Sequence, residues 1–443
     1  MKTVLDLHIH SRFSRACSKD LTLPTIAKWC ERKGIDVVGT GDFTHPAWRA
    51  EIERDLEPAE PGLFRLKSSL RGSENDRGNP VGIASSSRPR DDVRFMLTNE
   101  LSCIYKRGGK VRRVHHCVFV PSHAAADAIT SNLEKRGCNV KSDGRPILGL
   151  DSEELLKIVL DADPSSLMVP AHAWTPWFAI FGSQSGFDSI EECFGDLAPE
   201  IHAIETGLSS DPSMNWRLSA LDRVMLLSNS DAHSAPNLGR EANVMDLPER
   251  SYPAFADVLR KHQRERFLYT IEFFPEEGKY HYDGHRVCGV RLTPAETKKN
   301  HGLCPSCKKS VTVGVMHRVD ALADRPDGFR PPGAPDYRRL VPLMEVVADA
   351  LGKTKAAKLV GEMTEHLVEK VGSEFHILLD APIKEIEAHS SPEVAEAIRR
   401  MREGKITVLP GYDGVYGTVQ IFTDEERKGM KPRQNKLVWS PRL

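Results

Sequence analysis

The sequence predicts an α/β fold in which a barrel of alternating strands and helices precedes a small metal-bound module and a mainly helical C-terminal segment. Residues 1–270 alternate short apolar runs with amphipathic stretches, which favours strands joined by helical crossovers. Histidines and carboxylates close or directly follow these apolar runs, at the barrel face where loops distant in sequence meet. Beyond residue 279, paired Cys and His residues are typical of a zinc site.

The length and charge of the chain limit its number of domains and the partners that it can bind. The chain has 443 residues, and at roughly 150 residues per domain we expect two or three domains, at 1–270, 271–330 and 331–443. It carries 61 basic and 62 acidic residues, a net charge of −1, so local patches would have to hold any nucleic acid. No apolar run approaches the ~18 residues of a membrane span, and the N-terminus has no signal-peptide pattern, so we expect a cytoplasmic protein.

The nine cysteines are an odd number, which fits a reducing compartment better than a disulfide framework. Three of them cluster between residues 288 and 307. We expect the other six to be single buried thiols: Cys17, Cys30, Cys103, Cys117, Cys138 and Cys193.

The N-terminal strand carries the first candidate metal ligands. His8 and His10 are spaced i, i+2, which points them to the same side of a strand, although two solvated histidines would give the same pattern. Imidazole and carboxylate are the ligands of zinc and manganese, and a carboxylate can bridge two ions. Further candidates follow later strands, and their number predicts two or three ions: Asp42, His45, Glu100, His116, His172, Asp231 and His233.

The order of these motifs resembles the polymerase and histidinol phosphatase (PHP) family over residues 1–270. The chain also contains the segments Gly-Thr-Gly-Asp-Phe-Thr-His-Pro and Thr-Pro-Trp-Phe-Ala-Ile-Phe-Gly, followed by a cysteine-bearing module. In these segments it is similar to the endonuclease Q family, which nicks DNA beside deaminated bases. This second resemblance runs over nearly the whole chain. It implies a distorted (β/α)7 barrel, a zinc-ribbon-like module and a C-terminal mainly helical domain.

Ligands can be partitioned among three ions on this basis. We expect His8, His10, Glu100 and Asp231 at the first ion, and Glu100, His116 and His172 at the second. The third would take His233 with Asp42 or His45, because Phe43 stands where most PHP members have a histidine. The loop of residues 11–18 also lacks the usual acid or histidine, so one position would be short of protein ligands. Zinc is the expected metal, with Mg²⁺ or Mn²⁺ as an alternative at a catalytic position.

Glu100 and His116 lie at the base of a predicted hairpin whose turn is Gly108-Gly109. The functional interpretation is an arm along a phosphate backbone, and the alternative is a solvated hairpin. The arm's basic residues lie toward its tip: Lys106, Arg107, Lys110, Arg112 and Arg113.

Four aromatic residues lie within nine positions of His172: Trp174, Trp177, Phe178 and Phe181. Aromatic rings beside a nucleolytic centre can wedge into a duplex or stack on an everted base. Backbone donors in residues 182–186, which include Ser183 and Ser185, could then read the new carbonyl of a flipped deaminated base. The alternative for Phe178 and Phe181 is an aromatic core under the barrel rim.

Residues 279–330 form the clearest basic segment, with ten basic residues against five acidic ones. His285-x2-Cys288 and Cys304-x2-Cys307 have ribbon-like spacing and predict a structural zinc, with His281 as an alternative ligand. A segment this small cannot bury a core, so the metal would supply most of its folding free energy. Lys298 and Lys299 are candidate DNA contacts.

The remaining segments carry no visible chemistry. Residues 331–335 are a linker by composition, helical periodicity follows at 341–351, 355–371 and 394–402, and the basic tail of 428–442 could engage a sliding clamp. Residues 68–92 read as a long surface loop.

Three functions compete. The favoured one is a lesion-specific endonuclease that nicks double-stranded DNA 5′ of uracil or hypoxanthine, and also of xanthine or an abasic site, leaving a 3′-hydroxyl and a 5′-phosphate; the 5′ side is implied by the resemblance alone. A small-molecule phosphoesterase would have no need of the basic, metal-bound segments after residue 270. A non-catalytic DNA-binding scaffold would be expected to have lost several ligands.

Overall fold

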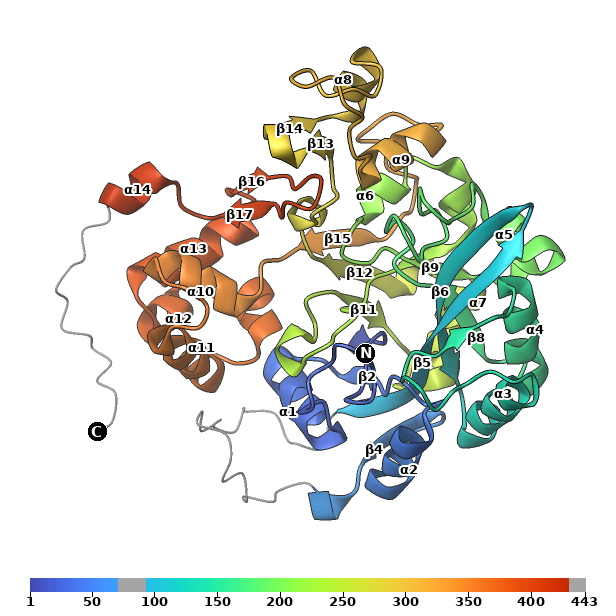
Figure 1. Cartoon of the computed structure of the whole chain (residues 1–443). Coiled ribbons are helices and arrows are strands. Elements are labelled where there is room, and N and C mark those ends of the chain that lie inside the picture. The colour runs from blue at the N-terminus through green and yellow to red at the C-terminus, as the bar shows by residue number, and fades with distance from the viewer. Residues whose placement is uncertain (71–92, 430–443) are drawn as a thin grey trace.

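The computed structural model describes residues 1–70 and 93–429 and has a mixed α/β fold around one large sheet (Figure 1). Eight strands lie in the order β15-β12-β11-β1-β2-β5-β4-β3; β6 and β7 also pair with β5, and β8 pairs with β6. The sheet strands are β1 (Lys2–Asp6), β2 (Val37–Gly39), β3 (Leu56–Pro58), β4 (Leu63–Leu66), β5 (Arg94–Arg107), β6 (Lys110–Val120), β7 (Ile147–Leu148), β8 (Leu167–Pro170), β11 (Ala242–Asp246), β12 (Phe267–Glu272) and β15 (Asp336–Arg339).

The sheet mixes strand directions, whereas the sequence predicted parallel strands. β1, β2 and β5 are parallel, and α1 (Leu23–Lys33) and α2 (Pro46–Asp55) lie in the connections between them. β5, β6 and β8 are antiparallel neighbours. β9 (Ala203–Glu205) and β10 (Met225–Leu227) pair in a separate sheet. Within the described residues, no ladder joins β9 and β10 to the main sheet, so the distorted (β/α)7 barrel stays a prediction.

Helices α3 (His123–Lys135), α4 (Ser152–Ala162) and α7 (Tyr252–Arg260) lie beside the β5–β6–β8 part of the sheet (Figure 1). The N-cap residues of these helices are Ser122, Asp151 and Ser251. The side chain of each accepts a hydrogen bond from a backbone N–H of the first turn. Their apolar faces join the core, which includes the fully buried Phe119 and Phe255. The helical layer thus fixes the far side of the strands that carry the site.

The predicted hairpin is confirmed. β5 and β6 pair antiparallel from Leu97↔Val120 to Arg107↔Lys110, and Gly108 (φ 61°) and Gly109 (φ 75°) form the turn. Both positive φ values fit a type I′ turn, which matches the twist of the strands.

The zinc-candidate segment projects from the top of the molecule in Figure 1, and four larger C-terminal helices pack to one side. The projecting segment contains β13 (Asp283–His285), β14 (Val290–Leu292), α8 (Pro294–Lys299) and α9 (Val315–Leu322). The C-terminal segment contains α10 (Leu343–Leu351), α11 (Lys358–Lys370), α12 (Ile383–His389), α13 (Pro392–Arg402), β16 (Thr407–Leu409), β17 (Thr418–Gln420) and α14 (Asp424–Gly429). The C-terminal segment is mainly helical, as the sequence predicted.

Several contacts tie the C-terminal segment to the main body, and two of them involve the main sheet and α1. β15 pairs parallel with β12 and so extends the main sheet, and the buried Lys33 of α1 forms an ion pair with Glu374 (2.8 Å). The predicted domain boundaries near residues 270 and 330 remain a prediction.

No helix among the described residues is long and apolar enough to cross a membrane. Two expectations fall outside the described part of the chain: most of the surface loop, at residues 71–92, and the clamp contact of the tail, at residues 430–443.

Candidate metal centre

Glu100 on β5 is the middle of a buried cluster of imidazoles and carboxylates. Its Oε2 lies 3.1 Å from His10 Nε2 and 3.5 Å from His8 Nε2. Its Oε1 lies 2.6 Å from His115 Nδ1 and 3.1 Å from His172 Nε2. Two groups of possible metal donors, each within 4.8 Å, therefore share this carboxylate: His8, His10, Glu100 and Asp231, and then Glu100, His115 and His172. The first group is the predicted first ligand set.

The loop that carries Asp231 is held against the end of β1. Ile9 forms a β-bridge with Ala232, and the buried Asp6 accepts hydrogen bonds from the backbone of Ser230 (3.0 Å) and Gly239 (2.9 Å). Burial raises the pKa of Asp6 to about 6. The side chain of Asp6 thus aligns two strand ends distant in sequence, which places the carboxylate of Asp231 beside His8 and His10.

Three residues of this region have left-handed backbone conformations that are uncommon outside glycine: Asp42 (φ 50°), His172 (φ 29°) and Asp231 (φ 46°). Such conformations cost about 1–3 kcal/mol each and concentrate at functional sites. Gly207 allows the close packing, because a Cβ there would lie 2.5 Å from His172 Cβ.

His8 is oriented by Glu205 on β9. Both carboxylate oxygens lie 3.0 Å from His8 Nδ1, and they also accept hydrogen bonds from His172 N and Asn229 Nδ2. This arrangement leaves His8 Nε2 buried, facing Glu100 and Asp231, without a hydrogen bond to the described residues. A carboxylate behind a histidine fixes the ring in this way in metal sites. The sequence analysis missed Glu205.

Asp42 orients His10 in the same manner. Its Oδ1 lies 3.2 Å from His10 Nδ1, and its Oδ2 accepts hydrogen bonds from Ser11 N, Ser11 Oγ and Ser14 Oγ. Both oxygens are thus engaged, and Asp42 belongs to no group of metal donors in the described structure. Asp42 was predicted as a ligand; the structure places it behind the ligands.

The second donor group contains His115 where the sequence predicted His116. Glu100 pairs with Cys117 and Ser102 with His115, so His115 shares the strand face of Glu100 and His116 points to the other face. His116 Nε2 instead lies 2.8 Å from Ser152 Oγ, with its ring against Phe194. Burial lowers the pKa of His115 to about 4 although Glu100 opposes the shift, so its imidazole is neutral, as metal binding requires.

The predicted third ligand set is not brought together. His45 begins α2 and stacks on Phe13 at 4.6 Å, and the partly exposed His233 lies near His10, with its Nδ1 3.5 Å from Asp231 Oδ1. Neither belongs to a donor group in the part of the chain described.

His8, Cys117 and Glu205 form a further buried group that the sequence did not predict. It is a weaker metal site than the other two. The Glu205 oxygens are occupied by hydrogen-bond donors, and burial raises the pKa of the Cys117 thiol, which keeps it protonated.

The chemistry of the centre fits divalent cations. Burial opposes charge on His10, but Asp231, Asp42 and Glu100 outweigh it and hold its pKa well above the usual value. A buried site that gathers carboxylates and imidazoles so closely favours positive charge, which metal ions would supply. Arg145 already supplies one positive charge, since its Nη1 lies 2.9 Å from Glu100 Oε2. The sequence analysis missed this residue as well. Its side chain is 27% exposed, so it also reaches the surface of the centre.

The aromatic loop begins directly at His172. The ring of Phe178 lies 4.7 Å from that of His115, and Trp177 is 42% exposed beside it. Trp174, however, is buried, with Nε1 donating to Asn215 Oδ1 (2.8 Å) and its ring 4.9 Å from Phe181. Trp174 and Phe181 are therefore core residues, and the prediction of Trp174 as a DNA contact is wrong because its ring packs inward.

Backbone contacts hold the loop along the edge of β6. His115 N donates to Phe178 O (3.1 Å) and Arg113 N to Ser185 O (3.2 Å). Ser185 is buried and its Oγ donates to Arg113 O (3.4 Å), whereas Ser183 is exposed. Of the two predicted base-reading serines, Ser183 alone presents its side chain to solvent.

The arginine side chains of the β5–β6 hairpin contact the aromatic loop and the start of α4. Arg107 forms ion pairs with Asp151 and Glu153. Arg112 stacks on Phe187 at 4.1 Å and donates to Gly186 O, and Arg113 lies 6.0 Å from the Phe178 ring. The exposed basic residues toward the tip are Lys106 and Lys110.

The second predicted metal site is assembled as expected. His285, Cys288, Cys304 and Cys307 place one donor atom each within 4.8 Å of one another. His281, the alternative ligand, is buried against Tyr282 and lies outside this group. Nearby, Lys298 forms an ion pair with Asp320 (2.5 Å), and Lys299 is exposed.

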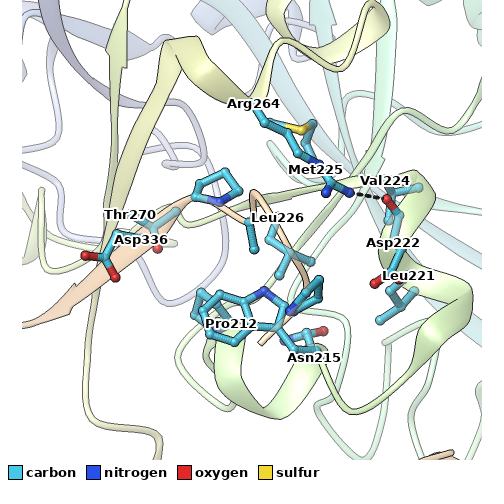
Figure 2. Close-up of a pocket in the computed structure, with 14 residues that line it drawn as sticks. Pro212, Asn215, Leu221, Asp222, Val224, Met225, Leu226, Arg264, Thr270 and Asp336 are labelled. Atoms are coloured by element: carbon cyan, nitrogen blue, oxygen red, sulfur yellow. Dashed lines mark hydrogen bonds between the residues drawn. The ribbon is translucent and has the colours of Figure 1, made fainter. Parts of the chain in front are cut away.

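A separate pocket lies under the linker and contains none of the predicted site residues (Figure 2). Linker residues Pro331, Ala334 and Pro335 form one wall, and Arg264 Nη2 donates to Asp222 O (2.5 Å) in another. The predicted linker is thus packed against the main body.

Comparisons with known proteins agree with this arrangement. Residues 342–405 match the family model described as the MJ0043 C-terminal domain. The uncharacterised protein YqxK of Bacillus subtilis is 28% identical over 431 residues, 95% of this chain and 99% of that protein. The uncharacterised protein MJ0043 of Methanocaldococcus jannaschii is 33% identical over 257 residues, and the match spans 56% of this chain and 31% of that protein's length.

Two solved structures are similar over nearly their full lengths. The lesion-specific endonuclease PfuEndoQ from Pyrococcus furiosus is 30% identical with a TM-score of 0.81, and the match covers 97% of this chain and 100% of the other. An endonuclease Q complex with a 27-mer duplex that has an abasic lesion at the active site is 31% identical with a TM-score of 0.80, covering 98% and 100%. At this identity and coverage, the chain belongs to the endonuclease Q family.

Proposed function

We propose that this chain nicks double-stranded DNA on the 5′ side of deaminated bases, uracil and hypoxanthine first, and accepts xanthine and abasic sites as well. As an endonuclease Q family member it is a metal-dependent DNA-cleaving enzyme. One observation carries the proposal: the buried centre shared through Glu100 continues directly into an exposed aromatic loop at Trp177 and Phe178. The donor centre around Glu100 is suited to phosphodiester hydrolysis with bound metal ions, and the aromatic loop is suited to holding an everted base.

The two donor groups that share Glu100 are proposed to hold two zinc ions, with Mg²⁺ or Mn²⁺ as the alternative. Clustered divalent cations, when bound, supply a nucleophile at neutral pH and neutralise the charge of an in-line phosphoryl displacement. Glu205 and Asp42 hold His8 and His10 with Nε2 toward that position. Arg145 adds a fixed positive charge beside Glu100, where a backbone phosphate would lie.

Because hydrolysis at phosphorus leaves the sugar–base bond untouched, we expect a 3′-hydroxyl, a 5′-phosphate and a base that is still attached. Phe178, Trp177 and Ser183 are the proposed contacts of the flipped nucleotide, and the exposed Lys106, Lys110 and Lys299 are the proposed phosphate contacts. A structural zinc at His285, Cys288, Cys304 and Cys307 would hold the projecting module together.

The decisive test is strand mapping on end-labelled duplexes that differ only in one central base. We expect a single nick 5′ of deoxyuridine and of deoxyinosine, and none in the undamaged duplex. Free base release, an unsaturated aldehyde at the 3′ end or equal cutting of undamaged DNA would contradict the proposal. Turnover of a small phosphomonoester with no DNA cleavage would favour the phosphoesterase alternative.

A further inference from the structure

Two aromatic residues are exposed at the surface although most others are packed. Among the large hydrophobic side chains exposed in the described residues, the only aromatic ones are Trp177 (42%) and Tyr416 (70%). Both belong to one line of contacts. The Trp177 and Tyr280 rings lie 5.9 Å apart, and Lys279 Nζ lies 5.6 Å from the Tyr280 ring and 5.8 Å from the Tyr416 ring. These four residues, Trp177, Lys279, Tyr280 and Tyr416, are called the aromatic strip below.

One end of the aromatic strip lies at the metal centre. Trp177 is followed by Phe178, whose ring packs against His115, and His115 in turn lies 2.6 Å from Glu100. The other end lies on the loop between β16 and β17, which comes from the C-terminal segment (Figure 1). A polymer bound at Glu100 would therefore meet a path of exposed and half-buried rings that leads away from the centre.

The loop that carries Tyr416 is held firmly in place. Backbone N–H groups of Gly411, Gly414 and Gly417 donate to the carbonyls of Glu276 (2.8 Å), Lys279 (2.8 Å) and Glu277 (3.0 Å). Asp413 accepts hydrogen bonds from Arg286 N (2.7 Å) and Thr312 Oγ1 (2.6 Å), and Gly414 (φ 83°) completes a tight turn.

Ordering a loop costs conformational entropy, and an exposed tyrosine recovers little of that cost through burial. The fold thus fixes the Tyr416 ring at the surface, in a position suited to a binding partner.

The charge of the aromatic strip favours a polyanion. Lys279 makes no ion pair with any described residue, whereas two nearby acids are engaged: Glu276 pairs with Arg339 (3.2 Å), and Asp413 accepts the two bonds given above. Aromatic faces with an interleaved cation are the composition of surfaces that bind unpaired nucleic acid.

We propose that the aromatic strip stacks DNA bases that neighbour the target nucleotide and leave the duplex stack when that nucleotide is everted, while Lys279 contacts a backbone phosphate. This inference rests on the nicking function proposed above. It assigns the loop of residues 411–417, in which the sequence showed no chemistry, a direct role in DNA binding.

The test uses full-length protein and single-turnover nicking of a deoxyuridine duplex, with the half-saturating protein concentration measured at several salt concentrations. Tyr416→Ala and Tyr280→Ala should each raise that concentration by about tenfold. The maximal nicking rate and the salt slope should stay close to the parent values. Lys279→Gln should lower the salt slope by about one, as expected for one lost phosphate contact.

Tyr416→Phe is the matched control, because it keeps the ring face and should behave like the parent. Half-saturation within twofold of the parent in both alanine variants would overturn the aromatic strip while leaving the nicking function intact. An equal loss in Tyr416→Phe would overturn stacking, since the hydroxyl group would then carry the contact. Failure of the parent to nick lesion DNA would overturn the proposed function, and the strip with it.

Discussion

The two metal-donor regions of this molecule are built in opposite ways. The donors that share Glu100 come from residues 8 to 231, and three carboxylates from separate segments, Asp6, Asp42 and Glu205, position them. The four donors of the projecting module come from residues 285 to 307, with only short strands and one short helix around them. The fold makes the first arrangement, to which we assign the proposed chemistry, whereas the second would depend on a bound metal for its own shape.

Arg318 is one of several side chains that join the two regions. Arg318 on α9 donates to the carbonyls of Phe181 and Phe187, at 3.0 Å each, and to Asp188 (2.5 Å). It therefore ties the module to the far part of the aromatic loop. Disturbing the module should displace the aromatic loop through this contact while leaving the donors around Glu100 in place.

The largest effect is expected from Asp231→Asn. The change removes a charge from the first donor group but keeps the shape of the side chain, which is 25% exposed. Nicking should fall by about a thousandfold or more, since metal-assisted charge stabilisation contributes several kcal/mol. Lesion DNA binding and the melting temperature should stay close to those of the parent. Loss of the folded state, measured by circular dichroism, would mean that this donor group is structural after all.

The next comparison separates His115 from its neighbour. His115→Gln removes a donor beside Glu100 and should reduce nicking by about a hundredfold or more. His116→Gln alters a side chain that contacts Ser152 and Phe194, so it should lower the melting temperature and leave nicking per folded molecule nearly unchanged. The reverse ranking in single-turnover assays would restore His116 as the ligand.

The contrast between His115 and His116 also shows which features of the site can be predicted from the sequence. Local patterns predict His8 and His10, the four donors between residues 285 and 307, and the Gly108-Gly109 turn, because spacing alone determines which residues meet. The choice between His115 and His116 depends on strand parity, which the turn already fixes: counting back from Arg107↔Lys110 places Glu100 opposite Cys117, and thus on the face of His115. That count needs only the turn position and was the available signal.

Other features had no local signal. Glu205 and Arg145 reach the centre through tertiary packing of segments that carry no motif, and the inward turn of Trp174 depends on Asn215 from another segment. Parallel strands were expected from strand–helix alternation, but the β5–β6 hairpin breaks that alternation and pairs its strands antiparallel. Contacts between distant segments, rather than local periodicity, decided each of these outcomes.

A smaller effect on chemistry is expected from Cys304→Ser, which removes one thiolate from the module. Bound zinc, measured by plasma emission spectrometry, should fall by about one equivalent, while the maximal nicking rate stays within a few-fold of the parent. Discrimination of deoxyuridine from undamaged duplex should decline, because α9 and Arg318 lose their support. Unchanged zinc content would dismiss the module as a metal site.

The smallest effect is expected at the junction of the regions, where Glu277 lies below the loop of residues 411–417. Burial and nearby Glu345 raise its pKa to about 8, against the opposing charge of Lys355. Between the ordinary carboxyl pKa of 4.5 and that value, the folded protein holds a proton that the unfolded chain releases, so this group's contribution to stability is lost as pH rises. Glu277→Gln should remove that loss.

The variant should melt close to the parent at pH 5 and about 1–3 °C above it at pH 8.5. Glu277 is not among the metal donors, so the nicking rate should not follow this titration. Parallel melting curves across the pH range would show that Glu277 is ionised in the folded protein. A matching change in the pH profile of nicking would instead show that the protonation of Glu277 affects the Glu100 centre. The two metal-donor regions would then not be independent of each other.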